Sequence, residues 1–370
     1  MDGQGQGAGS RPAAQDAVGL PEGHIGSTDP ADRNLKHSWA CRSLAPLSTW
    51  RFADRSSSSK PRVGDVVVAE IVKTGKHQRV MTASNKRLRM YPGDKILGAL
   101  GNRYATMAFE ARVSSLHKLH MLTGAGMLGT VRSRHSEQRA PTELRYLGHL
   151  LDESGKPVNL KDRLFPTETT ELAPCRTLLV VGTAMDTGKT TAVARLARGL
   201  ARRGKRVAAC KLTGSVSHRD PDELLATGVV DVRDFSDYGL PSTYLCPQDE
   251  LVRLYTRMLE DAARCEPEIV LMELADGLLQ RETSMLLSEP GLRRRAAGVL
   301  LTAPCAASAL YAVAAVEQLG HRVVGVSGVI TNSPLLVAEF GGRSSVPVAS
   351  SAGSGDALTD LVLERLRMAV

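Results

Sequence analysis

The hydrophobic pattern divides the chain into two regions with different periodicities. After Arg176, short apolar runs alternate with longer amphipathic segments, and the runs at 177–181 and 269–272 are almost entirely hydrophobic. Strands that are hydrophobic at nearly every position are typical of a parallel sheet with helices on both faces. We therefore predict an α/β domain over residues 171–370, with ligands bound at the carboxyl ends of its strands.

The other elements of this region follow the same alternation. The first helix is expected to end at Gly204, because glycine is common just after a helix. Helices are predicted at 190–203, 247–265, 306–319 and 356–368, and strands at 207–210, 298–301 and 323–330.

The region before this domain has a different pattern of hydrophobic residues. Short β-like runs occur at 66–72, 95–98 and 104–110, and Tyr91-Pro92-Gly93-Asp94 is typical of a turn. They predict a small β-rich domain over residues 60–170. Residues 1–59 begin with a stretch rich in Gly, Gln, Ala, Pro and Asp, and we expect this segment to be disordered or loosely ordered.

Composition narrows the class of protein. The chain has 370 residues, of which 42% are hydrophobic and 23% are charged, as in a soluble globular protein. No apolar run has the length of a membrane span, and no apolar core of a secretory signal is present near the start. The six cysteines are scattered singly, which favours reduced thiols. The expected compartment is the cytoplasm, without a membrane partner.

Positive charge is concentrated before the α/β domain. Residues 51–120 contain fourteen Lys/Arg and five Asp/Glu, a surplus of nine, while the whole chain has a formal net charge of +8. Such a surplus can bind nucleic acid or an anionic substrate, or simply form a solvated face. Aromatic residues make up only 4% of the chain and no nucleic-acid motif is recognisable, so no nucleic-acid partner is expected.

One segment carries the signature of a phosphate-binding loop. Between the strand at 177–181 and the following helix, the chain reads Gly182-Thr183-Ala184-Met185-Asp186-Thr187-Gly188-Lys189-Thr190-Thr191. Backbone N–H groups in such a loop cradle phosphate oxygens at the positive end of the helix dipole. Lys189 is expected to reach the β- and γ-phosphates, and the Thr190 hydroxyl to bind Mg²⁺. The predicted nucleotide contacts here are Gly182, Thr183, Met185, Asp186, Thr187, Gly188, Lys189, Thr190 and Thr191.

The loop resembles that of the dethiobiotin synthetase family. Five residues, rather than the usual four, separate Gly182 from Gly188, and the family's loop reads G-T-D-T-x-x-G-K-T. Ala184 and Met185 depart from the Asp and Thr of that pattern. Partition-type relatives have an additional lysine at the position of Ala184, so the chain does not resemble that branch.

Further landmarks of the same family follow in order. Lys211-Leu212-Thr213-Gly214 follows the second strand, where synthetases have Lys-Pro, and Glu273-Leu274-Ala275-Asp276-Gly277 stands where they have Glu-Gly-Ala-Gly-Gly. Gly328-Val329-Ile330-Thr331-Asn332-Ser333-Pro334 matches the family's Gly-x-x-x-Asn segment. The resemblance implies a mostly parallel P-loop NTPase fold with ATP and Mg²⁺ as cofactors.

The same resemblance implies roles for individual residues. Lys189 and Lys211 would neutralise the transferred phosphoryl group, Thr190 and Glu273 would bind Mg²⁺, and Asn332 would contact adenine. A third acidic ligand is expected after Lys211. Spacing does not distinguish among Asp222, Asp231 and Asp234, and Asp231 is our provisional assignment.

The first 170 residues have no counterpart in dethiobiotin synthetases. A second P-loop family, which includes D-glutamate N-acetyltransferases, has an additional N-terminal domain and a Thr-Gly segment similar to Thr213-Gly214. Its Asp-rich stretch is similar to residues 230–235. The two-domain layout of this chain is closer to that second family.

The expected activity is that of a ligase-like enzyme. It would use ATP and Mg²⁺ to convert a small carboxylate or carbamate into an acyl phosphate, which an amine then captures. The alternatives are an N-acyltransferase that binds coenzyme A on a P-loop scaffold, and a regulatory nucleotide switch. We expect a homo-oligomer that acts on a small molecule whose identity the sequence does not specify.

Overall fold

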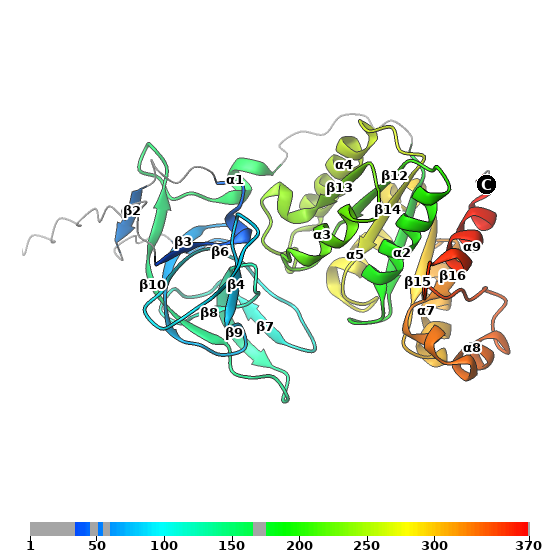
Figure 1. The fold of residues 1–370 in the computed structure, drawn as a ribbon, viewed down its shortest axis with the longest axis horizontal. Helices are drawn as coiled ribbons and strands as arrows, with labels where there is room; N and C mark the ends of the chain where they lie inside the picture. The colour runs from blue at the N-terminus through cyan, green and yellow to red at the C-terminus, as the bar shows by residue number, and fades with distance from the viewer. Residues whose placement is uncertain (1–33, 45–50, 55–59, 166–174, 369–370) are drawn as a thin grey trace, which may run out of the picture.

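The computed structural model describes residues 34–44, 51–54, 60–165 and 175–368. They form a β-rich part and an α/β part that lie side by side along the long axis of the molecule (Figure 1). Among the described residues, no helix combines the length and the apolar character needed to cross a bilayer.

The α/β part is built on a parallel sheet of six strands. Their order is β13-β12-β14-β11-β15-β16, and every neighbouring pair is parallel. The hydrophobic runs of the sequence are therefore buried parallel strands, and the prediction of an α/β fold is confirmed. The strands are β11 (Thr177–Gly182), β12 (Val207–Lys211), β13 (Asp231–Asp234), β14 (Ile269–Leu274), β15 (Ala296–Thr302) and β16 (Val323–Ser327).

Helices cover both faces of this sheet. Consecutive side chains of β11 point to opposite faces, so that Leu178 joins one hydrophobic core and Leu179 the other. The core of Leu178 contains α2 (Lys189–Arg202), α3 (Arg219–Leu225) and α9 (Asp356–Leu366). The core of Leu179 contains α4 (Gln248–Ala263), α5 (Arg281–Ser288), α6 (Pro290–Arg295), α7 (Ala306–Gln318) and α8 (Pro334–Gly341).

Five strands of the β-rich part close into a ring. β3 pairs with β6 and β10, β8 pairs with β10 and β9, and β9 returns to β6. Val67, Ala69 and Ile71 point into a core shared by all five strands, as period-two alternation requires. The strands are β1 (Leu35–His37), β2 (Arg51–Asp54), β3 (Val66–Lys73), β4 (Arg79–Met81), β5 (Arg87–Arg89), β6 (Lys95–Leu100), β7 (Phe109–Arg112), β8 (Leu119–Met121), β9 (Met127–Arg134) and β10 (Thr142–Leu151).

Two expectations for this region need correction. Residues 34–44 and 51–54 are not loosely ordered, because β1 pairs with β6, β2 pairs with β10, and Cys41 is fully buried. The rest of the segment 1–59 lies outside the described residues. The strand expected at 104–110 begins only at Phe109, because a turn in which Ala108 N donates to Ala105 O precedes it.

Direct contacts join the two parts. The segment after β12 carries Val216 into the hydrophobic core of the β-rich part, where it is 1% exposed. The guanidinium of Arg42, just after the 3₁₀ helix η1 (Trp39–Cys41), donates to Ser236 Oγ in η3 (Phe235–Tyr238) at 3.0 Å. The helix α1 (Leu160–Leu164) adds an ion pair between Lys161 and Glu250.

Candidate functional site

The loop between β11 and α2 has the backbone of a phosphate cradle. Gly188 caps α2 with φ of 93°, a left-handed conformation that glycine adopts without a steric penalty. Gly182 ends β11, and a Cβ at this position would lie 2.4 Å from Thr187 Oγ1 and 2.7 Å from Lys189 Nζ. A larger residue at 182 would therefore displace the side chains of Thr187 and Lys189. The strand, loop and helix occur in the order that the motif requires.

Neighbouring strand ends hold this loop in place. Thr183 N donates to Thr302 O at 3.0 Å, and the hydroxyls of Thr187 and Thr302 lie 2.7 Å apart. On the other side, Val329 N donates to Thr187 O at 3.1 Å. A Cβ on Gly328 would lie 2.1 Å from the same carbonyl oxygen, so the close approach of η4 (Val329–Asn332) depends on this glycine.

Lys189 is the first residue of α2 and its side chain is buried. Its Nζ donates to Ala184 O at 2.8 Å and to Asp276 O at 2.6 Å, so the ammonium group lies across the loop. Burial lowers the pKa of Lys189, and the carboxylates of Glu273 and Asp276 oppose that shift. A cation held by two neutral carbonyl groups is well placed to receive a phosphate.

Two strand ends and the first turn of α2 bring a threonine, a carboxylate and a second lysine together. Lys211 and Glu273 are register partners at the carboxyl ends of β12 and β14, and Lys211 Nζ lies 3.7 Å from Glu273 Oε1. The Thr190 hydroxyl donates to the same Oε1 at 3.0 Å. Burial alone would lower the pKa of Lys211, but Glu273 and Asp220 outweigh it and raise that pKa well above its usual value.

A second acidic partner of Lys211 is Asp220, which is not among the three aspartates that the sequence offered. Asp220 lies in the first turn of α3, and its carboxylate accepts a hydrogen bond from Lys211 Nζ. Helix α3 begins eight residues after β12 and folds back over the end of that strand. The spacing of residues along the chain does not predict this fold-back.

The provisional assignment of Asp231 as a metal ligand is wrong. Asp231 is the first residue of β13 and lies opposite Ala208, three residues before Lys211. It is therefore about 10 Å from the strand end at which Lys211 lies. Its carboxylate forms an ion pair with Arg233 at 2.8 Å. Asp222 is exposed on α3. Asp234 does lie opposite Lys211, but its side chain caps η3, and burial raises its pKa to about 6.

The donor set around Glu273 fits Mg²⁺. Glu273 is 3% exposed, and its Oε2 is buried without a hydrogen-bond partner among the described residues. A buried, unpaired carboxylate oxygen is costly unless a cation is close. Hydroxyl and carboxylate oxygens are the hard donors that Mg²⁺ accepts alongside phosphate oxygens and water. The described residues contain no group of three acidic, His or Cys side chains that would hold a metal without such additional ligands.

Asp276 is a further site residue that no motif indicates. It follows β14 with φ of 62°, an uncommon conformation for a residue other than glycine. Burial raises the pKa of Asp276 to about 6, against the opposing effects of Lys189, Lys211 and Arg103. Arg103 comes from the β-rich part, so this part of the molecule contributes a charged group to the site.

A cavity of 200 Å³ is lined by six of the predicted residues, and we refer to it as the phosphate cavity. Asn332 is not among its lining residues. It is exposed at the end of η4, on the segment that packs against the loop. Thr191 is exposed on α2 and also lies outside the lining. The lining residues predicted from the sequence are Met185, Asp186, Lys189, Thr190, Lys211 and Glu273, and those not predicted include Arg103, Tyr104 and Asp276.

Comparison with known proteins gives similarity only at the level of fold. No protein-family model matches the sequence, and no curated protein matches it. The solved structures similar to the chain include the signal recognition particle receptor FtsY from Elizabethkingia anophelis, at 16% identity and a TM-score of 0.35 over 57% of this chain and 75% of that one. The kinase domain of Escherichia coli tyrosine kinase ETK matches at 20% identity and 0.32, over 42% and 67%.

A DUF1611 family protein from Anabaena variabilis matches at 18% identity and a TM-score of 0.37, over 56% of this chain and 63% of that one. At such scores none of these likenesses extends to function. The loop at 182–190, between a parallel strand and a helix, together with the six-stranded sheet, gives this chain the P-loop NTPase fold. The finer resemblance to dethiobiotin synthetases finds no support in these comparisons.

Proposed function

We propose that the protein binds a nucleoside triphosphate with Mg²⁺ and transfers the γ-phosphoryl group to a small carboxylate. The observation that carries this proposal is the hydrogen bond from Thr190 to Glu273, whose second carboxylate oxygen is buried and unpaired among the described residues. Next to it are two buried lysines, Lys189 and Lys211. This combination matches what phosphoryl transfer requires, which is positioning and neutralisation of charge.

The lysines have separate roles in this mechanism. Lys189 would exchange its carbonyl partners for oxygens of the β- and γ-phosphates. Lys211, held by Asp220 and Glu273, stays protonated at neutral pH and would stabilise the charge on the transferred group. Thr190 and Glu273 would hold Mg²⁺, which when bound offsets negative charge on the β- and γ-phosphates.

The proposed reaction has two steps. A carboxylate oxygen of the substrate attacks the γ-phosphorus, and the bond from that phosphorus to the bridging oxygen breaks, so that the nucleoside diphosphate leaves with the electron pair. An amine then attacks the acyl carbon, and inorganic phosphate leaves as the nitrogen loses a proton. We assign ATP as the nucleotide, with adenine near Asn332, since η4 is packed against the loop.

Release of nucleoside diphosphate that depends on a small substrate tests this function. Purified protein would be incubated with ATP or GTP, Mg²⁺, and panels of carboxylates and amines, with Lys189→Ala as the control for contaminating activity. Stimulated release with ATP supports the proposal. Acyl transfer from acetyl-coenzyme A without nucleotide turnover would replace it with the acyltransferase, and slow turnover that no small molecule stimulates would replace it with the switch.

A further inference from the structure

A second and larger cavity lies next to the phosphate cavity, where the β-rich part meets the segment after β12. It has a volume of 640 Å³ and we refer to it as the cationic cavity. None of its described lining residues is Asp or Glu. Six of them are Lys or Arg: Lys76, Arg79, Arg87, Arg103, Arg139 and Arg219.

The positive charge of this cavity is compensated only in part, at its boundary with the phosphate cavity, where burial lowers the pKa of Arg103 and the carboxylate of Asp276 opposes that shift. Within the described part of the chain, no ion pair joins any of these six residues to a carboxylate. Lys76 and Arg103 instead lie over the same Phe109 ring, at 5.2 and 5.8 Å from its centroid. Burial lowers the pKa of Lys76, and the neighbouring charge of Arg103 lowers it further. Like charges held this close favour the binding of an anion.

Two polar atoms of the lining residues are also unpaired. Arg103 Nε and His77 Nε2 are buried and have no hydrogen-bond partner among the residues that the structure describes. Arg103 is fixed in this position, because its Nη1 donates to Leu122 O. Burial, and then Arg103 and Lys76, lower the pKa of His77 to about 4, so the imidazole is neutral at pH 7. A buried donor without a partner normally has a ligand or water as its missing partner.

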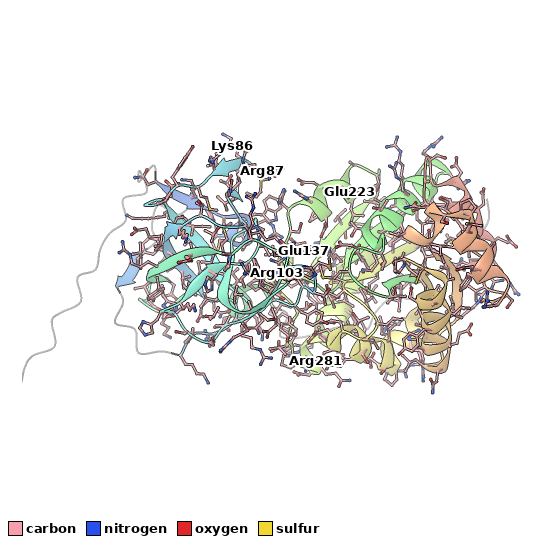
Figure 2. The ribbon with its side chains drawn as sticks, turned by 90° about the horizontal axis from the view of Figure 1, so that it is seen from below. Lys86, Arg87, Arg103, Glu137, Glu223 and Arg281 are labelled. Atoms are coloured by element: carbon pink, nitrogen blue, oxygen red, sulfur yellow. The ribbon has the colours of Figure 1, made fainter. Side chains whose placement is uncertain are left out.

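The two cavities share part of their walls. Arg103 and Ser215 line both the cationic cavity and the phosphate cavity. Figure 2 shows Arg103 between the two parts of the molecule, and Arg87 on the N-terminal side of the same junction. An acidic group bound at Arg103 would therefore be adjacent to Lys189 and Asp276.

We infer that the cationic cavity binds the carboxylate substrate of the proposed reaction. This substrate is a small molecule with at least two acidic groups, one of which reaches Arg103 at the boundary with the phosphate cavity. This inference rests on the proposed function, because it names the substrate class of the same site. The volume lies within the range of about 300–1,000 Å³ found for small-molecule sites. The described lining residues include no Phe, Tyr or Trp on which the bases of a single strand would stack.

The test measures binding of two defined probes to the full chain by calorimetry. Citrate represents a polycarboxylate and fructose 1,6-bisphosphate a polyphosphate, with fructose as the neutral control. The test variant is Arg79→Gln/Arg87→Gln, which removes two exposed cations of the cavity rim. The matched control is Arg132→Gln/Arg134→Gln, which removes the same charge from exposed positions of β9 that do not line the cavity.

We expect at least one probe to bind, and the Kd to rise about tenfold in the rim variant, as is usual for lost charge-assisted hydrogen bonds. The control variant should change the Kd less than about twofold. Probe binding is measured without nucleotide, so that loss of nucleotide turnover and loss of cavity binding are separate results. The stronger of the two probes identifies the acidic group.

Three results would overturn the inference. One is equal weakening in both double variants, which would indicate a response to net charge alone. Another is the absence of binding of both probes at about 1 mM. The third is tight binding of single-stranded DNA that the rim variant loses, which would make the cavity part of a nucleic-acid surface. Failure of the proposed function looks different: the probes bind as expected, but no substrate stimulates nucleotide turnover.

Discussion

The hydroxyl of Thr190 donates a 3.0 Å hydrogen bond to Glu273 across 83 residues of sequence. This bond connects the first turn of α2 to the end of β14 at the point where Mg²⁺ would bind. We expect Glu273→Gln to preserve the shape of the site while removing the charge that a metal needs. Turnover should fall about 10²-fold or more, the Mg²⁺ requirement should rise, and nucleotide affinity should change little.

Turnover as a function of Mg²⁺ concentration, with nucleotide binding measured separately, checks this prediction. Full activity of Glu273→Gln at low Mg²⁺ would mean that Glu273 only supports the strand end.

Replacing Lys189 with alanine removes the cation that lies across the loop. The side chain is buried, and among the described residues its hydrogen bonds go to two backbone carbonyl groups, so we expect the fold to survive. Nucleotide-dependent turnover should fall about 10²–10³-fold. Circular dichroism would verify folding, and normal turnover by this variant would show that the loop is not the active site.

Asp220 and Asp231 provide a matched pair of carboxylates. Asp220 contacts Lys211, whereas Asp231 pairs with Arg233 at the opposite end of a short strand. Asp220→Asn should therefore lower the pKa of Lys211 and reduce turnover, with a steeper loss at high pH as the lysine deprotonates. Asp231→Asn should leave the pH–rate profile unchanged. Equal effects of the two substitutions would contradict the assignment of Asp220 to the site.

Asp276 should make stability depend on pH. Its pKa is raised from 3.8 to about 6 in the folded state, so the folded protein binds this proton more tightly than the unfolded chain does. Its contribution is therefore unfavourable above pH 6, by about 3 kcal/mol, and this cost disappears as the pH falls from 6 towards 4.

Asp276→Asn removes the charge and keeps a residue type that tolerates positive φ. Without nucleotide, its free energy of unfolding should exceed that of the wild type at pH 8, and the difference should shrink towards pH 4. Denaturant titrations across this range measure the difference, and a constant difference would mean that Asp276 does not titrate as described.

Gly328 and Gly341 test whether the loop needs its support from η4. At Gly328, alanine would place Cβ 2.1 Å from Thr187 O in a backbone with φ of 85°. We expect Gly328→Ala to cost about 1–3 kcal/mol of stability and to weaken nucleotide binding. Gly341 lies in α8 with no atom near its Cβ direction, so Gly341→Ala should be neutral or slightly stabilising. Chemical denaturation and nucleotide titration of both variants would settle the comparison.

The fold and the centre of the site could be predicted because their signals are local. Each hydrophobic run ends where its strand ends, and parallel pairing places the carboxyl ends of the strands at one edge of the sheet. Lys211 and Glu273 therefore lie near the loop, as expected. The loop itself has a fixed sequence of glycine, lysine and threonine. Helix and strand boundaries for α2, β12, β14 and α7 differ from the predicted ranges by one or two residues.

The remaining site residues depend on contacts between distant segments. Asp220 reaches Lys211 because α3 folds back over the sheet edge, and Arg103 reaches Asp276 from a separate part of the molecule. Neither residue belongs to a motif. The hydrophobic periodicity of the sequence does not indicate the direction in which a loop turns. The buried segment around Cys41 was unpredictable for the same reason, since three-residue strands form only when a partner strand is already present.

Val216 has a consequence for how the molecule responds to its ligands. This residue is on the segment that leaves β12 immediately after Lys211, and it is embedded in the interior of the β-rich part. Separating the two parts would expose Val216 to water, so the two parts should unfold at similar temperatures. Heating should therefore give one unfolding transition instead of two. An anion that stabilises the β-rich part by binding in the cationic cavity should therefore also raise the affinity for nucleotide. Because such coupling is reciprocal, nucleotide should raise the affinity for the anion by the same factor.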